Sequence, residues 1–209
     1  MYIVYKTATT GLWDRNKEIG DATQARLCGV SWSLFDDNGV VIGNEKFRIC
    51  KLPVGVSVPM EASRIHGITD EICATKGKPV RWVLGEFLMD WYKADYECVY
   101  TFPFDLNILS NELKLDGRET LWQLREKRGS FPYYDLMEDS KPFCGLKNDW
   151  GKWKAPKMFL AYEMLTGNKW GFNPSLTEQV QKLSELFQAL KRRYNDEKEY
   201  KSQPSGVSV

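Results

Sequence analysis

The first quarter of the chain alternates short apolar runs with turns. Residues 2–5 (YIVY) are apolar, and residues 25–36 (ARLCGVSWSLFD) alternate apolar and polar positions with a period of two. Both patterns predict strands. The sequence Asp-Asp-Asn-Gly at 36–39 predicts a hairpin turn, after which residues 40–50 return as a third strand. The amino-terminal region is therefore expected to be rich in β-structure.

Two longer regions carry the spacing of amphipathic helices. Residues 174–194 predict a long helix, with Pro174 in its first turn and Asn173 as its cap. Residues 59–93 are also expected to be helical. Their last helix has one apolar face, formed by Val83, Leu84, Phe87, Leu88 and Trp91.

Short elements separate these helices. Residues 98–103 predict a buried strand, 104–115 a helix, and 133–138 a strand that runs into a loop. This order of strands and helices predicts an α/β fold with a mixed sheet. We expect one domain over residues 1–194, followed by a charged, flexible tail at 195–209.

Composition narrows the class of protein. Of the 209 residues, 43% are hydrophobic and 13% aromatic, which is enough for a sizeable core. The net charge of +1 means that any contact with a nucleic acid depends on local basic patches. Five cysteines without a CxxC pair, and a single histidine, argue against a zinc site or a disulfide framework. We expect a cytoplasmic protein with no signal peptide, no membrane span and no cofactor.

Six segments, in chain order, resemble the motifs of one enzyme family. They are YIVYKTATTGL, PMEASRIHGITDE, CVYTFPFDLNIL, YYDLM, KAPKMFLAYEMLTG and NPSLTEQVQKLSELFQAL. They resemble the motifs of the DnaQ-like (DEDD) 3′–5′ exonucleases, from hydrophobic-D-x-E-T-T-G-L in the first strand to H-x-A-L-x-D in the last helix. The resemblance spans nearly the whole chain. It implies an RNase H-like fold, in which helices flank a mixed central sheet.

The resemblance also implies a mechanism with two divalent cations, Mg²⁺ or Mn²⁺. Such enzymes hold the cations with four carboxylates, and a His or Tyr acts as general base on the attacking water. In the first motif, however, Lys6 and Ala8 stand at the two acid positions. Asp105 retains the acid of the second motif, but the preceding His-Asn pair is Tyr100-Thr101.

The last motif departs from the family in the same way. Glu178 stands at the acid position and Asn173 at the position of the histidine, so no general base remains. We expect Lys6 to lie near Asp105 and Glu178, where its ammonium replaces the cations in an ion network. The alternatives are that Asp105 caps the helix beginning near it and that Glu178 is a solvated charge in a first turn. Changes in three motifs favour natural degeneration over deliberate inactivation.

A second candidate surface interleaves lysines with tryptophans between residues 147 and 170. This pattern is typical of a groove that binds a single strand, because bases stack on the rings and phosphates meet the cations. The alternative is that the tryptophans belong to the core. In the family, the segment around the only histidine is structural or lines the substrate groove. The candidate nucleic-acid contacts are Thr9, Thr10, His66, Trp150, Lys152, Trp153, Lys154 and Lys169.

These observations lead to three hypotheses of function. The first is a pseudoenzyme, a catalytically inactive exonuclease fold that binds a single-stranded DNA or RNA end, a protein partner such as a polymerase or defence complex, or both. The second is an active 3′–5′ exonuclease with Mg²⁺ or Mn²⁺ in an atypical site built on Asp105, Glu178 and another acid. The third is a protein-directed mimic or decoy that binds no nucleic acid.

Overall fold

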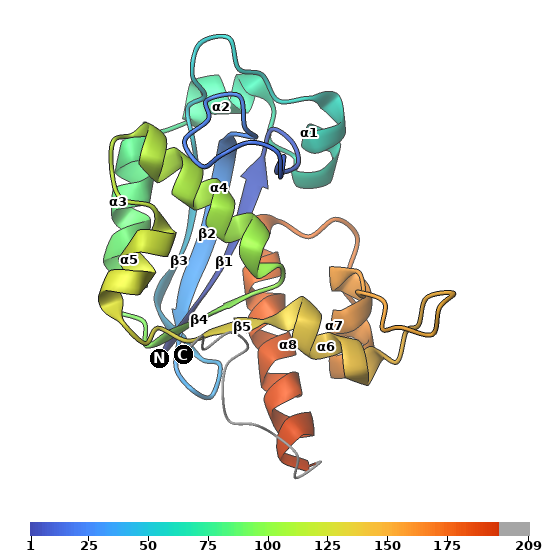
Figure 1. The fold of residues 1–209 in the computed structure, drawn as a ribbon. Coiled ribbons are helices and arrows are strands. Elements are labelled where there is room, and N and C mark those ends of the chain that lie inside the picture. The colour runs from blue at the N-terminus through green and yellow to red at the C-terminus, as the bar shows by residue number, and fades with distance from the viewer. Residues whose placement is uncertain (197–209) are drawn as a thin grey trace.

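The computed structural model describes residues 1–196, in which helices surround one mixed, five-stranded sheet (Figure 1). The sheet has the order β3-β2-β1-β4-β5; β3, β2 and β1 are antiparallel neighbours, whereas β1, β4 and β5 run parallel. The mixed α/β fold predicted from the sequence is confirmed. The strands are β1 (Tyr2–Thr9), β2 (Leu27–Phe35), β3 (Val41–Ile49), β4 (Tyr96–Val99) and β5 (Tyr133–Asp135).

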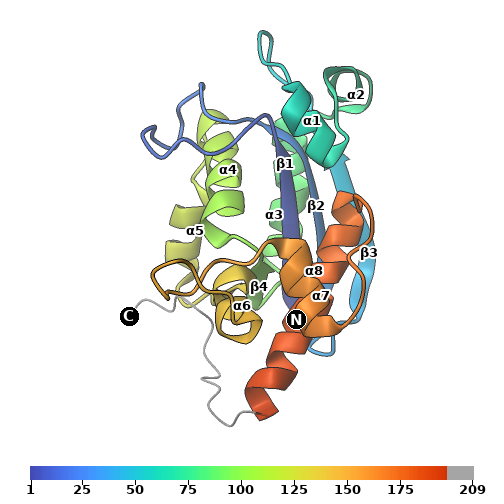
Figure 2. The same cartoon turned by 90° about the vertical axis from the view of Figure 1, so that its right-hand side faces the viewer.

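Helices lie on both faces of the sheet. Helices α3, α4 and α5 cover one face, α8 with α6 and α7 covers the other, and α1 and α2 lie beyond the carboxyl end of β1 (Figures 1 and 2). Their bounds are α1 (Met60–His66), α2 (Asp70–Lys76), α3 (Val80–Trp91), α4 (Phe102–Leu115), α5 (Leu121–Arg128), α6 (Leu136–Cys144), α7 (Met158–Thr166) and α8 (Leu176–Asp196).

The central strand β1 separates two hydrophobic cores. Ile3 and Tyr5 pack into the core beneath α3 and α4, whereas Tyr2 and Val4 pack into the core beneath α8. Side chains alternate between the two faces of a strand, so Thr7 follows Tyr5 on the face that α4 covers. Thr7 can therefore contact the first turn of α4.

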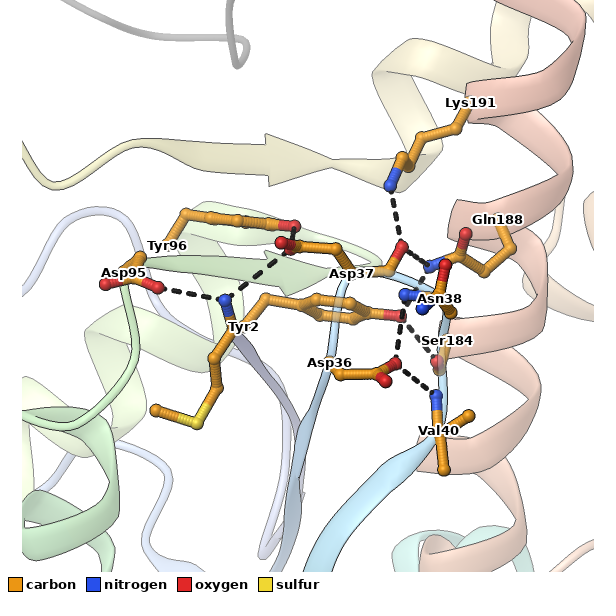
Figure 3. A network of polar contacts seen from close by, with 11 residues as sticks. Tyr2, Asp36, Asp37, Asn38, Val40, Asp95, Tyr96, Ser184, Gln188 and Lys191 are labelled. Carbon is orange, nitrogen blue, oxygen red and sulfur yellow. Dashed lines mark hydrogen bonds and ion pairs between the residues drawn. The ribbon is translucent and has the colours of Figure 1, made fainter.

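A polar network holds α8 against the β2–β3 turn (Figure 3). Asp36 Oδ1 accepts from the backbone N–H groups of Asn38 and Val40 at 2.9 Å, which confirms the predicted turn. Gln188 Nε2 donates to Tyr2 Oη at 3.0 Å, and the same hydroxyl lies 2.8 Å from Ser184 Oγ. Burial raises the pKa of Tyr2 to about 12, so the hydroxyl stays protonated and able to donate.

Several element boundaries differ from the sequence predictions. The strand expected at 98–103 lies at Tyr96–Val99, and α4 already begins at Phe102. Helices α5 and α6 were not predicted; α5 begins with a capping box between Thr120 and Gln123. Helix α8 continues two residues past the predicted domain boundary at 194, and the rest of the predicted tail lies outside the described residues.

The composition led us to expect no disulfide framework and no membrane span. All five cysteines are buried and free, as predicted. Among the helices within residues 1–196, none combines the length and apolar character needed to cross a membrane.

Candidate functional site

The first acid position of the first motif and the acid of the second meet between β1 and α4. Lys6 Nζ lies 2.8 Å from both Oδ1 and Oδ2 of Asp105. Asp105 Oδ1 also accepts from the backbone N–H of Thr7 at 3.0 Å and from Thr7 Oγ1 at 2.6 Å. The Asp105 side chain is 0% exposed and that of Lys6 is 17% exposed. The predicted Lys6–Asp105 pair is therefore present, and the prediction that Asp105 caps its helix is wrong.

Ala8 has a purely apolar environment. It is buried in a small cluster with Cys28, Ile68 and Leu176, which come from β2, the turn between α1 and α2, and the start of α8. A carboxylate at this position would have to displace these side chains. Ala8, at the second acid position of the first motif, is thus part of a hydrophobic cluster.

Glu178 does not join the ion network, and this part of the prediction is wrong. It lies in the first turn of α8, is exposed, and its Oε2 accepts from the backbone N–H of Ser175 at 2.7 Å and from Ser175 Oγ at 2.8 Å. These bonds form a capping box and hold the pKa of Glu178 below its usual value. Leu176 and Val180 face the core, and a residue midway between them on a helix points the opposite way. The alternative of a solvated first-turn charge is confirmed.

Asn173 and Pro174 precede α8 and do not start it. Because Ser175 forms the capping box and the helix begins at Leu176, the predicted cap at Asn173 is wrong. Asn173 is exposed and has a left-handed backbone, with φ of 49°. An amide at this place offers no general base.

Tyr100, at the histidine position of the second motif, has a structural contact. It is 6% exposed, and its hydroxyl donates to the carbonyl oxygen of Pro156 at 2.7 Å. Burial raises the pKa of Tyr100, which keeps this hydroxyl protonated. Thr101 precedes α4 but makes no side-chain capping bond. The residues at the His-Asn positions therefore support the fold around β4.

The side chains at this site do not fit a pair of divalent cations. Such cations need several carboxylate oxygens that are free of other partners. Here both oxygens of Asp105 contact an ammonium group, Ala8 provides no ligand, and Glu178 is bonded to Ser175. In the part of the chain that the structure describes, no three His, Cys, Asp or Glu side chains form a group that could hold a metal ion.

Three other buried acids were not recognised in the sequence, because they pair with residues far along the chain. Glu97 accepts from Tyr5 Oη at 2.8 Å and pairs with Arg125. Burial raises the pKa of Glu97 above its usual value, although the Arg125 guanidinium acts against this rise. Each acid has protein partners, so none is a ready ligand for an atypical metal site. The other two are Asp90 and Glu112. A fourth buried acid, Asp135, is a hydrogen-bonding residue at the end of β5, as expected from its place in YYDLM, and it caps α6 by accepting from the N–H groups of Met137 and Glu138.

The three candidates around the end of β1 have bonds within the protein. Thr9 Oγ1 donates to the carbonyl oxygen of Gly11 at 2.7 Å, and Thr10 Oγ1 accepts from the backbone N–H of Arg26 at 2.8 Å. His66 Nδ1 accepts from the N–H of Ile68 at 3.1 Å. The other ring nitrogen therefore carries the proton and donates to the carbonyl oxygen of Thr9, also at 3.1 Å. His66 joins α1 to the end of β1 as a neutral imidazole.

We expect His66 to make stability depend on pH. Burial lowers the pKa of His66 below the unfolded value, so the unfolded chain binds the proton more readily. The contribution of the neutral ring is complete above about pH 6.5 and is lost as the pH falls through the lower folded pKa. Urea unfolding of the wild type and of His66→Asn across this range measures it. The difference between the two free energies of unfolding isolates His66, because the buried carboxyl groups contribute equally to both proteins. A difference that does not change with pH would contradict the prediction.

The basic and aromatic candidates lie on a hairpin that projects between α6 and α7 (Figure 1). Trp150 is 81% exposed and Trp153 is 49% exposed, so the alternative that they belong to the core is wrong. It holds only for Trp170, which is 9% exposed. Lys152 and Lys154 are exposed on the same hairpin. Lys169 is exposed beyond the opposite end of α7, so it does not belong to this group.

No protein-family model and no curated protein matches the sequence. Solved structures do match the fold. The ExoI/SSB-Ct complex has a TM-score of 0.70 at 15% identity, and the match covers 93% of this chain and 42% of that chain. E. coli exonuclease I in complex with a dA16 oligonucleotide has a TM-score of 0.67 at 15% identity, with 91% and 40% covered. This chain thus spans less than half the length of these exonuclease I chains.

A shorter structure matches over nearly its full length. Exonuclease X in complex with 5′ overhanging duplex DNA has a TM-score of 0.58 at 14% identity, and 92% of each chain is covered. At this level of identity the likeness concerns the arrangement of helices and strands. The chain therefore has the α/β fold of the DnaQ-like exonucleases, an RNase H-like mixed sheet flanked by helices.

Proposed function

We propose that this chain is a catalytically inactive protein with a DnaQ-like exonuclease fold that acts by binding single-stranded nucleic acid. The observation that carries the proposal is the Lys6 ammonium, which lies 2.8 Å from both oxygens of Asp105. The Lys6 ammonium is thus paired with Asp105, the acid at a metal-ligand position of the family motif. Without free carboxylates and a general base among the described residues, this site has no means of activating water at the phosphodiester.

A fold that has lost its catalytic groups can still bind a ligand. Two similar structures are complexes of exonucleases, one with a dA16 oligonucleotide and one with 5′ overhanging duplex DNA. In this chain, exposed tryptophans and lysines share one hairpin, and this combination suits stacked bases and phosphates. The five buried, free thiols suit a reducing compartment such as the cytoplasm.

Fluorescence anisotropy of a labelled single-stranded oligonucleotide tests the proposal. We expect binding without any divalent cation, and we expect the affinity to fall as salt rises, because bound phosphates release counterions. DNA and RNA versions of one sequence show which is preferred. If neither binds at low salt, the proposal is wrong and a protein ligand, such as a polymerase or defence complex, becomes the better hypothesis.

A further inference from the structure

We infer that residues 146–154 form a binding element for internal segments of a single strand, separate from the degenerate site at Lys6 and Asp105. The inference rests on the proposed function and names the surface that performs it. The degenerate site at Lys6 and Asp105 would bind the end of a strand. The rings of the hairpin are exposed and do not enclose a ligand, so the hairpin should bind a strand anywhere along its length.

The hairpin has a well-defined backbone. Asn148 Oδ1 accepts from the N–H groups of Trp150 and Lys152, and the N–H of Gly151 donates to the carbonyl oxygen of Asn148 at 2.9 Å. Gly151 has φ of 72°, which only glycine adopts without strain. This is a turn followed by a left-handed glycine, a common way to close a hairpin. The turn places Trp150 at the tip.

The stem fixes the second ring and joins the hairpin to the core. Lys147 pairs with Trp153 across the hairpin, and Lys147 Nζ lies 5.2 Å from the centroid of the Trp153 ring. At the base, the N–H of Lys154 donates to the carbonyl oxygen of Leu146 at 2.8 Å. Tyr100 anchors the following segment through the carbonyl oxygen of Pro156. The Trp153 ring and the backbone at Trp150 are thus held in position before any ligand arrives, which lowers the entropic cost of binding.

Charge selects the kind of ligand. The segment 146–157 contains four exposed lysines and a single acid, Asp149. The lysines alternate with the rings, so the hairpin presents no continuous apolar patch of the kind that a membrane or a hydrophobic protein groove would cover. Rings beside ammonium groups match a chain in which bases alternate with phosphates. Single-stranded nucleic acid is therefore the ligand that this chemistry fits.

Removing the rings should weaken binding without unfolding the protein. Loss of one stacked base corresponds to about a 5- to 150-fold rise in Kd, so Trp150→Ala with Trp153→Ala should raise it at least about 25-fold. Trp82→Ala is the matched control, because Trp82 is 47% exposed and lies under Arg48 as Trp153 lies near Lys147. We expect this control to bind like the wild type. Lys152→Ala with Lys154→Ala should lower the salt slope by about 1.4.

The deciding experiment measures anisotropy with a labelled oligothymidylate in linear and circularised forms. We expect the wild type to bind both with similar Kd, and the double tryptophan variant to lose both. Unchanged binding by that variant, or binding only to the linear form, would overturn the hairpin inference and leave the proposed function standing. If the wild type binds neither form, the proposed function falls with it. In that case, binding of the whole protein to anionic vesicles, lost in the double tryptophan variant, would identify a membrane ligand instead.

Discussion

Replacing Lys6 with Met is expected to lower the free energy of unfolding by about 3–5 kcal/mol, because it leaves a buried carboxylate without its cation. Asp105 is fully buried, and after the change only Thr7 would donate to it. The apolar stem of Met occupies a similar volume to that of Lys, so the loss would come from the charge and not from a cavity. Urea unfolding followed by circular dichroism measures the change.

A second substitution shows whether charge is the cause. Asp105→Asn should destabilise the wild type, since the pair with Lys6 loses its negative charge. In the Lys6→Met background the same substitution should restore stability, because the amide oxygen still accepts from Thr7 and no net charge remains buried. A coupling free energy near zero in this double-mutant cycle would contradict the account of the pair.

Restoring the acid at the second position of the first motif is expected to be equally costly. Ala8→Glu should destabilise the fold by more than about 3 kcal/mol, because it adds volume and a carboxylate to an apolar cluster. Ala8 is 2% exposed and packs with Ile68 and Leu176, neither of which can donate a side-chain hydrogen bond. Thermal unfolding with and without Mn²⁺ measures the loss.

The small polar variant Ala8→Ser controls for the change in chemistry at nearly constant size. We expect it to stay close to the wild type, since a serine hydroxyl can donate to a carbonyl oxygen within its own strand. Stabilisation of Ala8→Glu by Mn²⁺ would show that the fold still assembles a metal site there. That result would support the active-exonuclease alternative.

The Lys6–Asp105 contact could be predicted from sequence because the resemblance places both residues at metal-ligand positions of one site. The apolar run before Lys6 predicts the strand, and the leucines after Asp105 predict the helix. The resemblance placed Glu178 in the same site, and this was wrong. Each residue turns a helix by about 100°, so Leu176 and Val180 on the core face place Glu178 on the opposite face of α8. The start of α8 was also misplaced, because the capping box with Ser175 sets it and Pro174 had suggested an earlier one.

The hairpin shows a signal that was present but not used. The sequence Asn-Asp-Trp-Gly at 148–151 contains an Asn that can bond to its own backbone and a Gly suited to a left-handed position. These residues predict a tight turn and hence an exposed Trp150. Hydrophobicity favoured a core position instead, and it was correct only for Trp170. By contrast, the pairing of Glu97 with Arg125 joins distant segments and leaves no local trace.

The fate of a single strand in the presence of metal tests the central claim most directly. A 5′-labelled oligonucleotide is incubated with the wild type and with Asp105→Asn, in Mg²⁺ or Mn²⁺, and its length is followed on a denaturing gel. We predict that the oligonucleotide stays at full length with both proteins, because Lys6 already occupies Asp105. Stepwise shortening from the 3′ end by the wild type, lost in Asp105→Asn, would contradict the account and identify an active exonuclease.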